Sequence, residues 1–498
     1  MNERRLSHGI FSLASRSVRR ASVVGGALVI ASGVVVACRP IATPAKQSIA
    51  PFVPSAAQVA FLDTVQRRTF DWFWETTNAT NGLVPDRWPT QSFSSVAAVG
   101  FGLTSYLVGV ERGWITREQA RDRVLTTLRF FWTAPQGSEA TNVTGHRGFF
   151  YHFLDMERGL RFKTVELSTI DTGLLLMGVL STRQYFDRAE AGDSTVRALA
   201  DSIYFRVDWP WARNAAASLT MGWHPESGFI TSRWIGYNEA MLLYALALGS
   251  PTHPIEADAW ASWVGGYRWD RFHGQEYVMF GPLFGHQYSH VWLDYRGIQD
   301  AYMRARGIDY FENSRRATLA HRAYATANPG GWRGYVDSVW GLTASDGPLD
   351  SSFVLGGRQR QFHTYWARGA GTDEINDDGT IVPTAAGGSV PFAPEVAIPA
   401  LSAMRRQYGD PLFGRYGFVD AFNPSLIDAS LRVSQGRIHA GIGWFDTDYL
   451  GIDQGPILLM IENQRSEFVW RLMRGNPHLA RGLCRAGFTG GWLAGKCS

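Results

Sequence analysis

The sequence lacks most features that would place it in a common functional class. Only three of its 498 residues are cysteine, and only 18% are charged. It contains no HExxH zinc motif, no GxSxG nucleophile motif and no GxGxxG dinucleotide motif. One near-match to a phosphate-binding loop, residues 490–496, is followed by Cys497 and Ser498, so no helix follows it to hold a phosphate. Metalloprotease, serine-hydrolase and nucleotide-binding classes therefore have no support.

Positive charge is also scarce outside the N-terminus. Residues 1–37 carry five arginines and one glutamate, which accounts for the whole net charge of +4. The remainder of the chain is therefore close to neutral. An electrostatic nucleic-acid binder would need an excess of positive charge, so we do not expect nucleic acid as a partner.

The N-terminal arginines precede an apolar run, residues 23–37, that is too short to span a bilayer as a helix. Small residues lie directly before Cys38, as in a bacterial lipoprotein signal whose cysteine becomes the lipidated first residue. We expect a lipoprotein-type signal over 1–37, a membrane contact only through a lipid on Cys38, and an extracytoplasmic location, in the periplasm or as an outer-membrane lipoprotein. Ordinary secretion is the alternative. A Pro/Ala/Ser-rich tether over 38–57 follows.

Helical periodicity dominates the rest of the chain. Long Gly/Trp/Pro-rich connections separate the periodic segments, and loops of such length are usually functional. The pattern predicts an all-α fold, a single (α/α)6 barrel over 58–475 whose long loops form a substrate cleft. A Gly-rich tail over 476–498 follows, in which Cys484 and Cys497 could form a disulfide. The periodic segments are 59–74, 116–132, 168–186, 238–248, 297–327 and 397–408.

Aromatic residues are plentiful, with 19 Trp and 18 Tyr. Many will be core, but several lie beside His, Asp and Arg. Such residues suit a cleft that stacks on flat apolar faces with polar rims, and sugar rings are ligands of this kind.

Acidic residues in aromatic loops are the candidates for chemistry. Hydrolysis of a glycosidic bond needs a carboxylic acid to protonate the leaving oxygen and a carboxylate that activates water or attacks directly. Asn238 is predicted to cap a helix, which places Glu239 in its first turn, where desolvation could raise the pKa as a general acid needs. The catalytic candidates are Glu239, Asp171, Glu166, Asp346 and Asp420.

Each candidate also has a purely structural interpretation. Asp171 follows Ser168 by three residues, so its sole role could be to complete a capping box. Asp346 precedes Gly-Pro and could be an ordinary turn residue. Asp453 is interpreted as a cap of the helix that follows it.

No metal or cofactor is expected. His286 and His290 lie four residues apart, as a metal pair on a helix would, but no third ligand is evident, so both are predicted to be polar residues beside the cleft. The acidic cluster at 373–378 is interpreted as a solvated turn, with a calcium site as the alternative.

Together these segments resemble the glucoamylase-like domain family, particularly the bacterial endo-β-1,2-glucanases of glycoside hydrolase family 144. The likeness covers residues 57–475. The motifs that carry it are 69–74 (TFDWFW), 85–87 (PDR), 166–172 (ELSTIDT), 236–240 (GYNEA), 249–254 (GSPTHP), 281–284 (GPLF), 286–290 (HQYSH), 340–342 (WGL), 391–395 (PFAPE) and 453–456 (DQGP).

The resemblance implies an (α/α)6 barrel that cleaves β-1,2-linked glucan without a cofactor. It makes Glu239 the leading general acid and leaves the roles of the other four acids open. Two other functions remain: a surface lipoprotein that binds glycans without cleaving them, and a polysaccharide lyase using His286, Tyr288 and Arg296. The expected substrate-binding residues are Asp86, Arg87, Trp234, Tyr237, His286, Gln287, His290 and Trp340.

Overall fold

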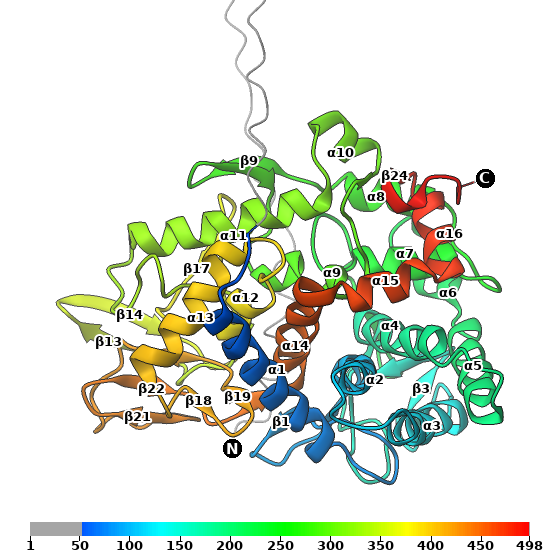
Figure 1. Ribbon diagram of the computed structural model, residues 1–498, viewed down its shortest axis with the longest axis horizontal. Coiled ribbons are helices and arrows are strands. Elements are labelled where there is room, and N and C mark those ends of the chain that lie inside the picture. Colours follow the sequence, from blue (N-terminus) through cyan, green and yellow to red (C-terminus); the bar gives the residue numbers. More distant parts are fainter. Residues whose placement is uncertain (1–51, 498) are drawn as a thin grey trace, which may run out of the picture.

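The computed structural model describes residues 52–497, which fold mainly into helices joined by long loops (Figure 1). The helices, in chain order, are α1 (Ala56–Thr76), α2 (Val96–Glu111), α3 (Arg117–Thr133), α4 (Thr169–Tyr185), α5 (Ala191–Phe205), α6 (Trp209–Arg213), α7 (Met241–Gly249), α8 (Asp258–Val264), α9 (Tyr288–Trp292), α10 (Ala301–Arg306), α11 (Tyr310–Ala327), α12 (Pro383–Gly387), α13 (Pro394–Tyr408), α14 (Gly451–Ser466), α15 (Phe468–Arg474) and α16 (Pro477–Arg485), with short 3-10 helices at Leu283–His286 and Gly491–Leu493.

The helices α2, α4, α7, α9, α12 and α14 are buried almost throughout and contact one another in a closed cycle. Helix α2 packs on α4 and α14, α4 packs on α7, and α12 packs on α14. The Ser289 hydroxyl of α9 donates to Glu239 O and accepts from Leu242 N in α7. Gln287, just before α9, donates to Ala385 O in α12. Helices that are apolar on all sides must be surrounded by protein, and this cycle forms the interior.

The longer amphipathic helices lie outside this cycle. Helix α1 packs on α14 and α2, α5 packs on α4 and α3, and α13 packs on α12. Figure 1 shows α1, from the start of the described chain, beside α14 from near its end. A capping box starts α1, since Ser55 Oγ accepts from Gln58 N while the Gln58 side chain accepts from Ser55 N.

Two glycines allow α2 and α4 to approach closely. A Cβ atom at Gly100 would lie 2.2 Å from Leu174 O, and one at Gly178 would lie 2.2 Å from Gly100 O. Backbone at that distance cannot yield to a side chain, so only glycine fits. The contact fixes α4, whose first turn carries Asp171, against the interior.

The long loops pair into small antiparallel sheets, which the sequence did not predict. The largest has five strands in the order β3-β4-β6-β7-β8, and its central strand β6 runs directly into α4. The strands are β1 (Arg87–Trp88), β2 (Ser94–Ser95), β3 (Gly145–His146), β4 (Phe149–Tyr151), β5 (Phe153–Leu154), β6 (Leu167–Ser168), β7 (Gly222–His224), β8 (Gly228–Phe229), β9 (Trp269–Phe272), β10 (Gln275–Val278), β11 (Ile298–Gln299), β12 (Ala344–Ser345), β13 (Ser351–Leu355), β14 (Arg358–Phe362), β15 (Trp366–Ala367), β16 (Gly369–Ala370), β17 (Ile375–Asn376), β18 (Phe413–Gly414), β19 (Gly417–Phe418), β20 (Phe422–Asn423), β21 (Arg437–His439), β22 (Gly443–Phe445), β23 (Tyr449–Leu450) and β24 (Thr489–Gly490).

The prediction of a mainly helical chain is confirmed, although strands are also present. The helices predicted at 59–74, 116–132 and 168–186 are α1, α3 and α4 with ends shifted by a few residues. The segment 297–327 divides into α10 and α11, because Gly307 adopts a left-handed conformation after α10. The closed barrel of six helical hairpins stays a prediction.

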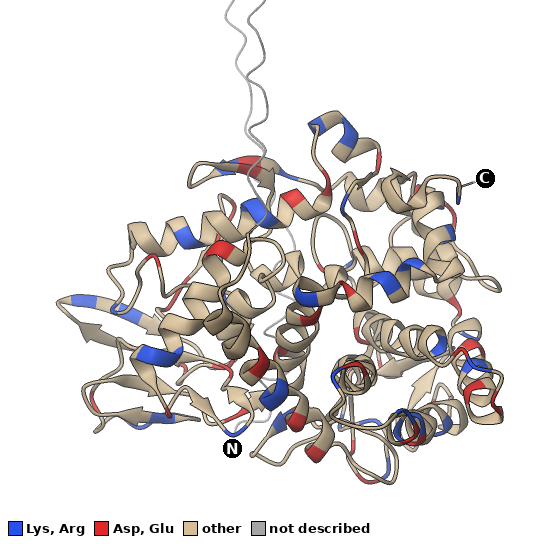
Figure 2. Cartoon of the chain, in the orientation of Figure 1, with Lys and Arg blue, Asp and Glu red and all other residues tan. Residues whose placement is uncertain are grey.

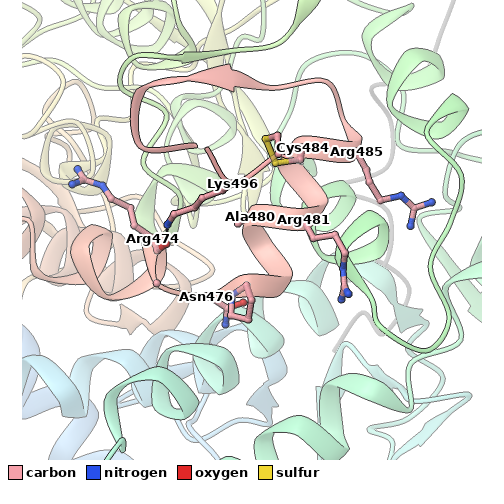
Figure 3. Close-up of a pocket in the computed structure, with 10 residues that line it drawn as sticks. Arg474, Asn476, Ala480, Arg481, Cys484, Arg485 and Lys496 are labelled. Atoms are coloured by element: carbon pink, nitrogen blue, oxygen red, sulfur yellow. Dashed lines mark hydrogen bonds between the residues drawn. A yellow bond between two sulfur atoms is a disulfide. The ribbon is translucent and has the colours of Figure 1, made fainter. Parts of the chain in front are cut away.

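The two ends of the chain differ from expectation in different ways. The signal and lipidation site predicted at 1–38 lie outside the described residues, whereas α1 begins at Ala56, inside the predicted tether. The C-terminal tail belongs to the fold: α16 packs on α7, β24 pairs with β11, and Cys484 and Cys497 form a disulfide (Figure 3).

Positions of basic and acidic residues are interspersed along the helices in the view of Figure 2. Within residues 52–497, no helix combines the length and apolarity required to cross a lipid bilayer.

Candidate active site

A cavity of about 770 Å³ lies where loops from many parts of the chain meet. The start of α4, the loop before α7, the segment around β10 and the loop after β14 all contribute to its wall. Its wall combines four carboxylates, three of them buried, with aromatic side chains. The lining includes His152, Glu166, Asp171, Trp234, Tyr237, Glu239, Tyr288 and Tyr365.

A second cavity, of about 660 Å³, lies at the C-terminal tail (Figure 3). Its lining contains four basic residues and no carboxylate. The cations are already bonded to the protein, since Arg481 and Arg485 donate to the carbonyls of Gly249 and Leu248, and Lys496 Nζ donates to Arg474 O. Chemistry that needs carboxylates therefore belongs to the first cavity.

The first group of acids, here called the cavity carboxylates, consists of Glu166, Asp171 and Glu239. Strand β6 is held between β4 and β7, which places Glu166 just before it and Asp171 one turn into α4. Ser168 Oγ accepts from Asp171 N and donates to Asp171 Oδ2 at 2.5 Å. Ser168 is therefore the N-cap of α4, but the Asp171 carboxylate accepts from the Ser168 hydroxyl and does not complete the predicted capping box; Asp171 lines the cavity.

Glu239 precedes α7 instead of lying in its first turn. The helix begins at Met241 without a side-chain cap, so Asn238 is not the predicted N-cap; its Oδ1 accepts from Ala240 N. Glu239 is 6% exposed, and its Oε2 has no hydrogen-bond partner in the described part of the chain. Burial, with a smaller contribution from the charge of Asp171, raises the pKa of Glu239 to about 7. Such a group can hold a proton near neutral pH and donate it.

His152, which sequence reasoning missed, connects two of the cavity carboxylates. Its Nδ1 lies 2.8 Å from Glu166 Oε1 and its Nε2 lies 3.6 Å from Asp171 Oδ1. Burial alone would lower the pKa of His152, but the charges of Asp171 and Glu166 outweigh this effect and raise it to about 9. The imidazole is therefore a cation at neutral pH.

A second group, the buried aspartate cluster, consists of Asp346, Asp420, Asp446 and Asp453. Asp346 N donates to Asp420 Oδ2 at 2.7 Å, which brings together two predicted candidates from distant loops. Burial and neighbouring aspartates raise the pKa of Asp420 and of Asp446 well above the usual range. Burial and the charges of Asp346 and Asp86 raise the pKa of Asp453 to about 7.

Arg87 pairs with an aspartate of this cluster. Its Nε lies 3.0 Å from Asp86 Oδ2 and its Nη1 lies 2.6 Å from Asp346 Oδ2. The charges of Asp420 and Asp453 also act on Tyr288 and Tyr365, which line the cavity. The cluster therefore lies directly behind the cavity wall.

In the described residues, one group of three carboxylates could hold a metal ion. Oxygens of Asp346, Asp420 and Asp446 lie within 4.8 Å of one another, but Asp346 is already paired with Arg87. The acidic run at 373–378 is not a solvated turn throughout. Asp378 is buried against Arg368, and Asp373 lines the cavity.

The predicted substrate-binding residues divide into two sets. Trp234 and Tyr237 line the cavity, and Asp86 and Arg87 lie beside the buried aspartate cluster. The other four lie in the interior and outside the cavity lining, so the geometry gives their predicted role no support. These are His286, Gln287, His290 and Trp340.

The interior histidines have structural partners. His286 Nε2 is bonded to Phe280 O and His290 Nε2 to Ser314 Oγ. Burial lowers the pKa of His286 to about 3, so its ring is neutral. Gln287 joins α9 to α12 through Ala385 O and the Ser389 hydroxyl.

Asp446 and Asp453 were missed for different reasons. Asp453 was interpreted as a helix cap, which is wrong: Leu450 is the N-cap of α14 and no side chain caps it. Asp446 follows Trp444 and Phe445, the same aromatic-loop signal that singled out Asp420. No sequence pattern pointed to His152, because its partners Glu166 and Asp171 lie farther along the chain, beyond a loop and a strand.

Comparison with known proteins identifies the family. Residues 231–477 match the model of the Glycoamylase family, described as putative glucoamylase. A crystal structure of a putative glucoamylase from Bacteroides fragilis superimposes with a TM-score of 0.73 at 30% identity, covering 88% of this chain and 100% of that one. The chain belongs to the glucoamylase-like family. The resemblance inferred from the motifs is thus confirmed.

Two other proteins to which this chain is similar have named activities. An endo-β-1,2-glucanase from Chitinophaga pinensis, solved with sophorotriose and glucose, is 28% identical, with a TM-score of 0.74 over 88% of this chain and 100% of that one. An exo-β-1,2-glucooligosaccharide sophorohydrolase from Parabacteroides distasonis is 29% identical over 85% of this chain. This chain spans only 57% of the length of that relative.

Proposed function

We propose that this glucoamylase-like chain hydrolyses β-1,2-linked glucan by carboxylate general acid/base catalysis. The observation that carries the proposal is Glu239, a buried carboxyl on a cavity wall with an unbonded oxygen and a pKa raised to about 7. The aromatic lining of the same cavity suits sugar rings. Relatives named for activity on β-1,2-glucan support the choice of linkage.

Glu239 is proposed as the general acid that protonates the leaving oxygen. Asp171, Glu166, Asp346 and Asp420 are the candidates for base, nucleophile or water-positioning roles. Asp453 joins them, because it lies beside Asp420 and its charge acts on Tyr288, as does that of Glu239. The separation between acid and base sets whether the anomeric configuration is inverted or retained.

We propose an endo mode of cleavage, with release of disaccharides from a chain end as the alternative. The cavity wall comes from many segments of the chain, between residues 152 and 452. The named endo- and exo-acting relatives support one mode each.

Two further parts of the proposal concern the whole chain. The closed cycle of buried helices with amphipathic helices outside it supports an (α/α)6 barrel. The disulfide between Cys484 and Cys497 supports an extracytoplasmic protein, where such bonds persist, consistent with a lipid anchor at Cys38.

The test is incubation of residues 39–498 with linear β-1,2-glucan, with β-1,3- and β-1,4-glucans in parallel. A ladder of short β-1,2-oligosaccharides of many lengths is expected for endo cleavage, and disaccharide alone from the first time point would mean exo cleavage. Binding without any product would favour the non-catalytic glycan-binding lipoprotein.

The lyase alternative loses its site in this structure. Of the three residues it requires, His286 is a neutral interior ring and Arg296 is paired with Asp294 and Glu467. The appearance of unsaturated products that absorb in the ultraviolet would support the lyase alternative.

A further inference from the structure

We propose that His152 is a positioning residue: its protonated ring, held between Glu166 and Asp171, keeps these two cavity carboxylates ionised and fixed beside Glu239. This inference rests on the proposed function, because it assigns His152 a part in the same reaction. No direct contact of His152 with substrate is required.

The local structure fixes the ring from several sides. The backbone N of His152 donates to Glu166 O, and its carbonyl accepts from Val96 N at the start of α2. The ring stacks on Phe153, with centroids 3.8 Å apart. These contacts leave both ring nitrogens facing carboxylates, at 2.8 Å from Glu166 and 3.6 Å from Asp171.

Three carboxylates on one wall would otherwise repel one another. Glu166 and Asp171 are 4% exposed each, so water screens their charges poorly. One cation placed between them offsets that repulsion, and it lowers the pKa of Glu166 against the opposing effect of burial. The Asp171 carboxylate in turn acts on Glu239, whose proton is the one the proposed reaction uses.

The other charged groups around His152 are few. Asp86, from the loop before β1, adds negative charge that favours the protonated ring. His224 of β7 acts on Glu166. Glu239, before α7, faces Asp171. None of them replaces His152 between the two carboxylates.

Removal of the charge has a definite sign. In a His152→Gln variant, burial and the charge of Glu166 raise the pKa of Asp171 without the opposing cation. Asp171 then takes up a proton at higher pH. We expect the acidic limb of the kcat/KM profile on β-1,2-glucan to move up by about one pH unit or more, the usual effect of losing an adjacent opposite charge.

His152→Lys keeps a cation and should return the limb part of the way toward wild type. His253→Gln is the matched control, because His253 is exposed and lies outside the cavity lining. An unchanged acidic limb in His152→Gln would overturn the proposal, as would equal shifts in the Gln and Lys variants. Thermal melting checks that each variant is folded.

A second measurement needs no activity and no variant. The ring nitrogen shifts of ¹⁵N-labelled wild type should show His152 doubly protonated at neutral pH and titrating at about 9. Titration near the ordinary value for histidine would overturn the proposal. If the wild type cleaves no β-1,2-glucan but His152 titrates at high pH, the proposed function fails while the ion-pair arrangement stands.

Discussion

Replacement of Glu239 by glutamine tests the proposed chemistry most directly. Glutamine keeps the size and one hydrogen-bonding oxygen but cannot donate a proton to a leaving group. General acid catalysis contributes about 10²–10⁴-fold. That corresponds to about 3–5 kcal/mol of activation free energy, since each tenfold change is about 1.4 kcal/mol. We therefore expect kcat on β-1,2-glucan to fall by a hundredfold or more, with KM little changed.

The stability of the same variant should depend less on pH than the stability of the wild type. The pKa of Glu239 is raised from 4.5 to about 7 in the folded state, so stability from its neutral form is complete below pH 4.5 and is lost as pH rises through 7. A shift of this size corresponds to about 3 kcal/mol. The free energy of unfolding of Glu239→Gln, relative to wild type, should therefore rise by about that amount between pH 4.5 and pH 8, as measured by urea denaturation.

Wild-type activity should fall above pH 7, where Glu239 loses its proton. Glu157→Gln is the matched control, since Glu157 is exposed and lies outside the cavity lining. Turnover of Glu239→Gln at the wild-type rate would refute the general-acid assignment. Equal pH dependence of stability in Glu239→Gln and wild type would refute the claim that burial sets the pKa of Glu239.

Two further changes probe what holds the site and the tail in place. Arg368→Met leaves Asp378 buried without its partner at 2.8 Å, so urea denaturation should show a loss of about 3–5 kcal/mol, and Arg368→Met with Asp378→Asn should recover part of it. No recovery in the double variant would mean that Arg368 acts chiefly through its bonds to Ser345. Cys484→Ser with Cys497→Ser opens a loop of 13 residues and should cost about 3 kcal/mol, seen as a lower Tm that reductant also produces in the wild type. A Tm unaffected by reductant would contradict this expectation.

Several outer helices and the family could be predicted from the sequence, whereas α5 and α16 were not predicted. Helices such as α1 and α3 are amphipathic, with caps at Ser55 and Thr116, so periodicity and capping residues place them well. The interior helices are buried on nearly all sides, so their apolar residues show no single face; α4 and α7 were predicted, but α2 and α14 were not. The long motifs identified the family without any prediction of the helices.

The grouping of the acids depends on the tertiary structure and could not be predicted from the sequence. The aromatic loop and the apolar helix that flank Glu239 predicted that desolvation could raise its pKa, but its degree of burial and the nearby charge of Asp171 come from the tertiary structure. Asp346 and Asp420 are 74 residues apart and meet because their loops converge behind the cavity wall. His152 became part of the site through contacts to Glu166 and Asp171 across a loop and a helix start. Charge interactions act through space over a few ångströms, so the order of residues along the chain carries little information about them.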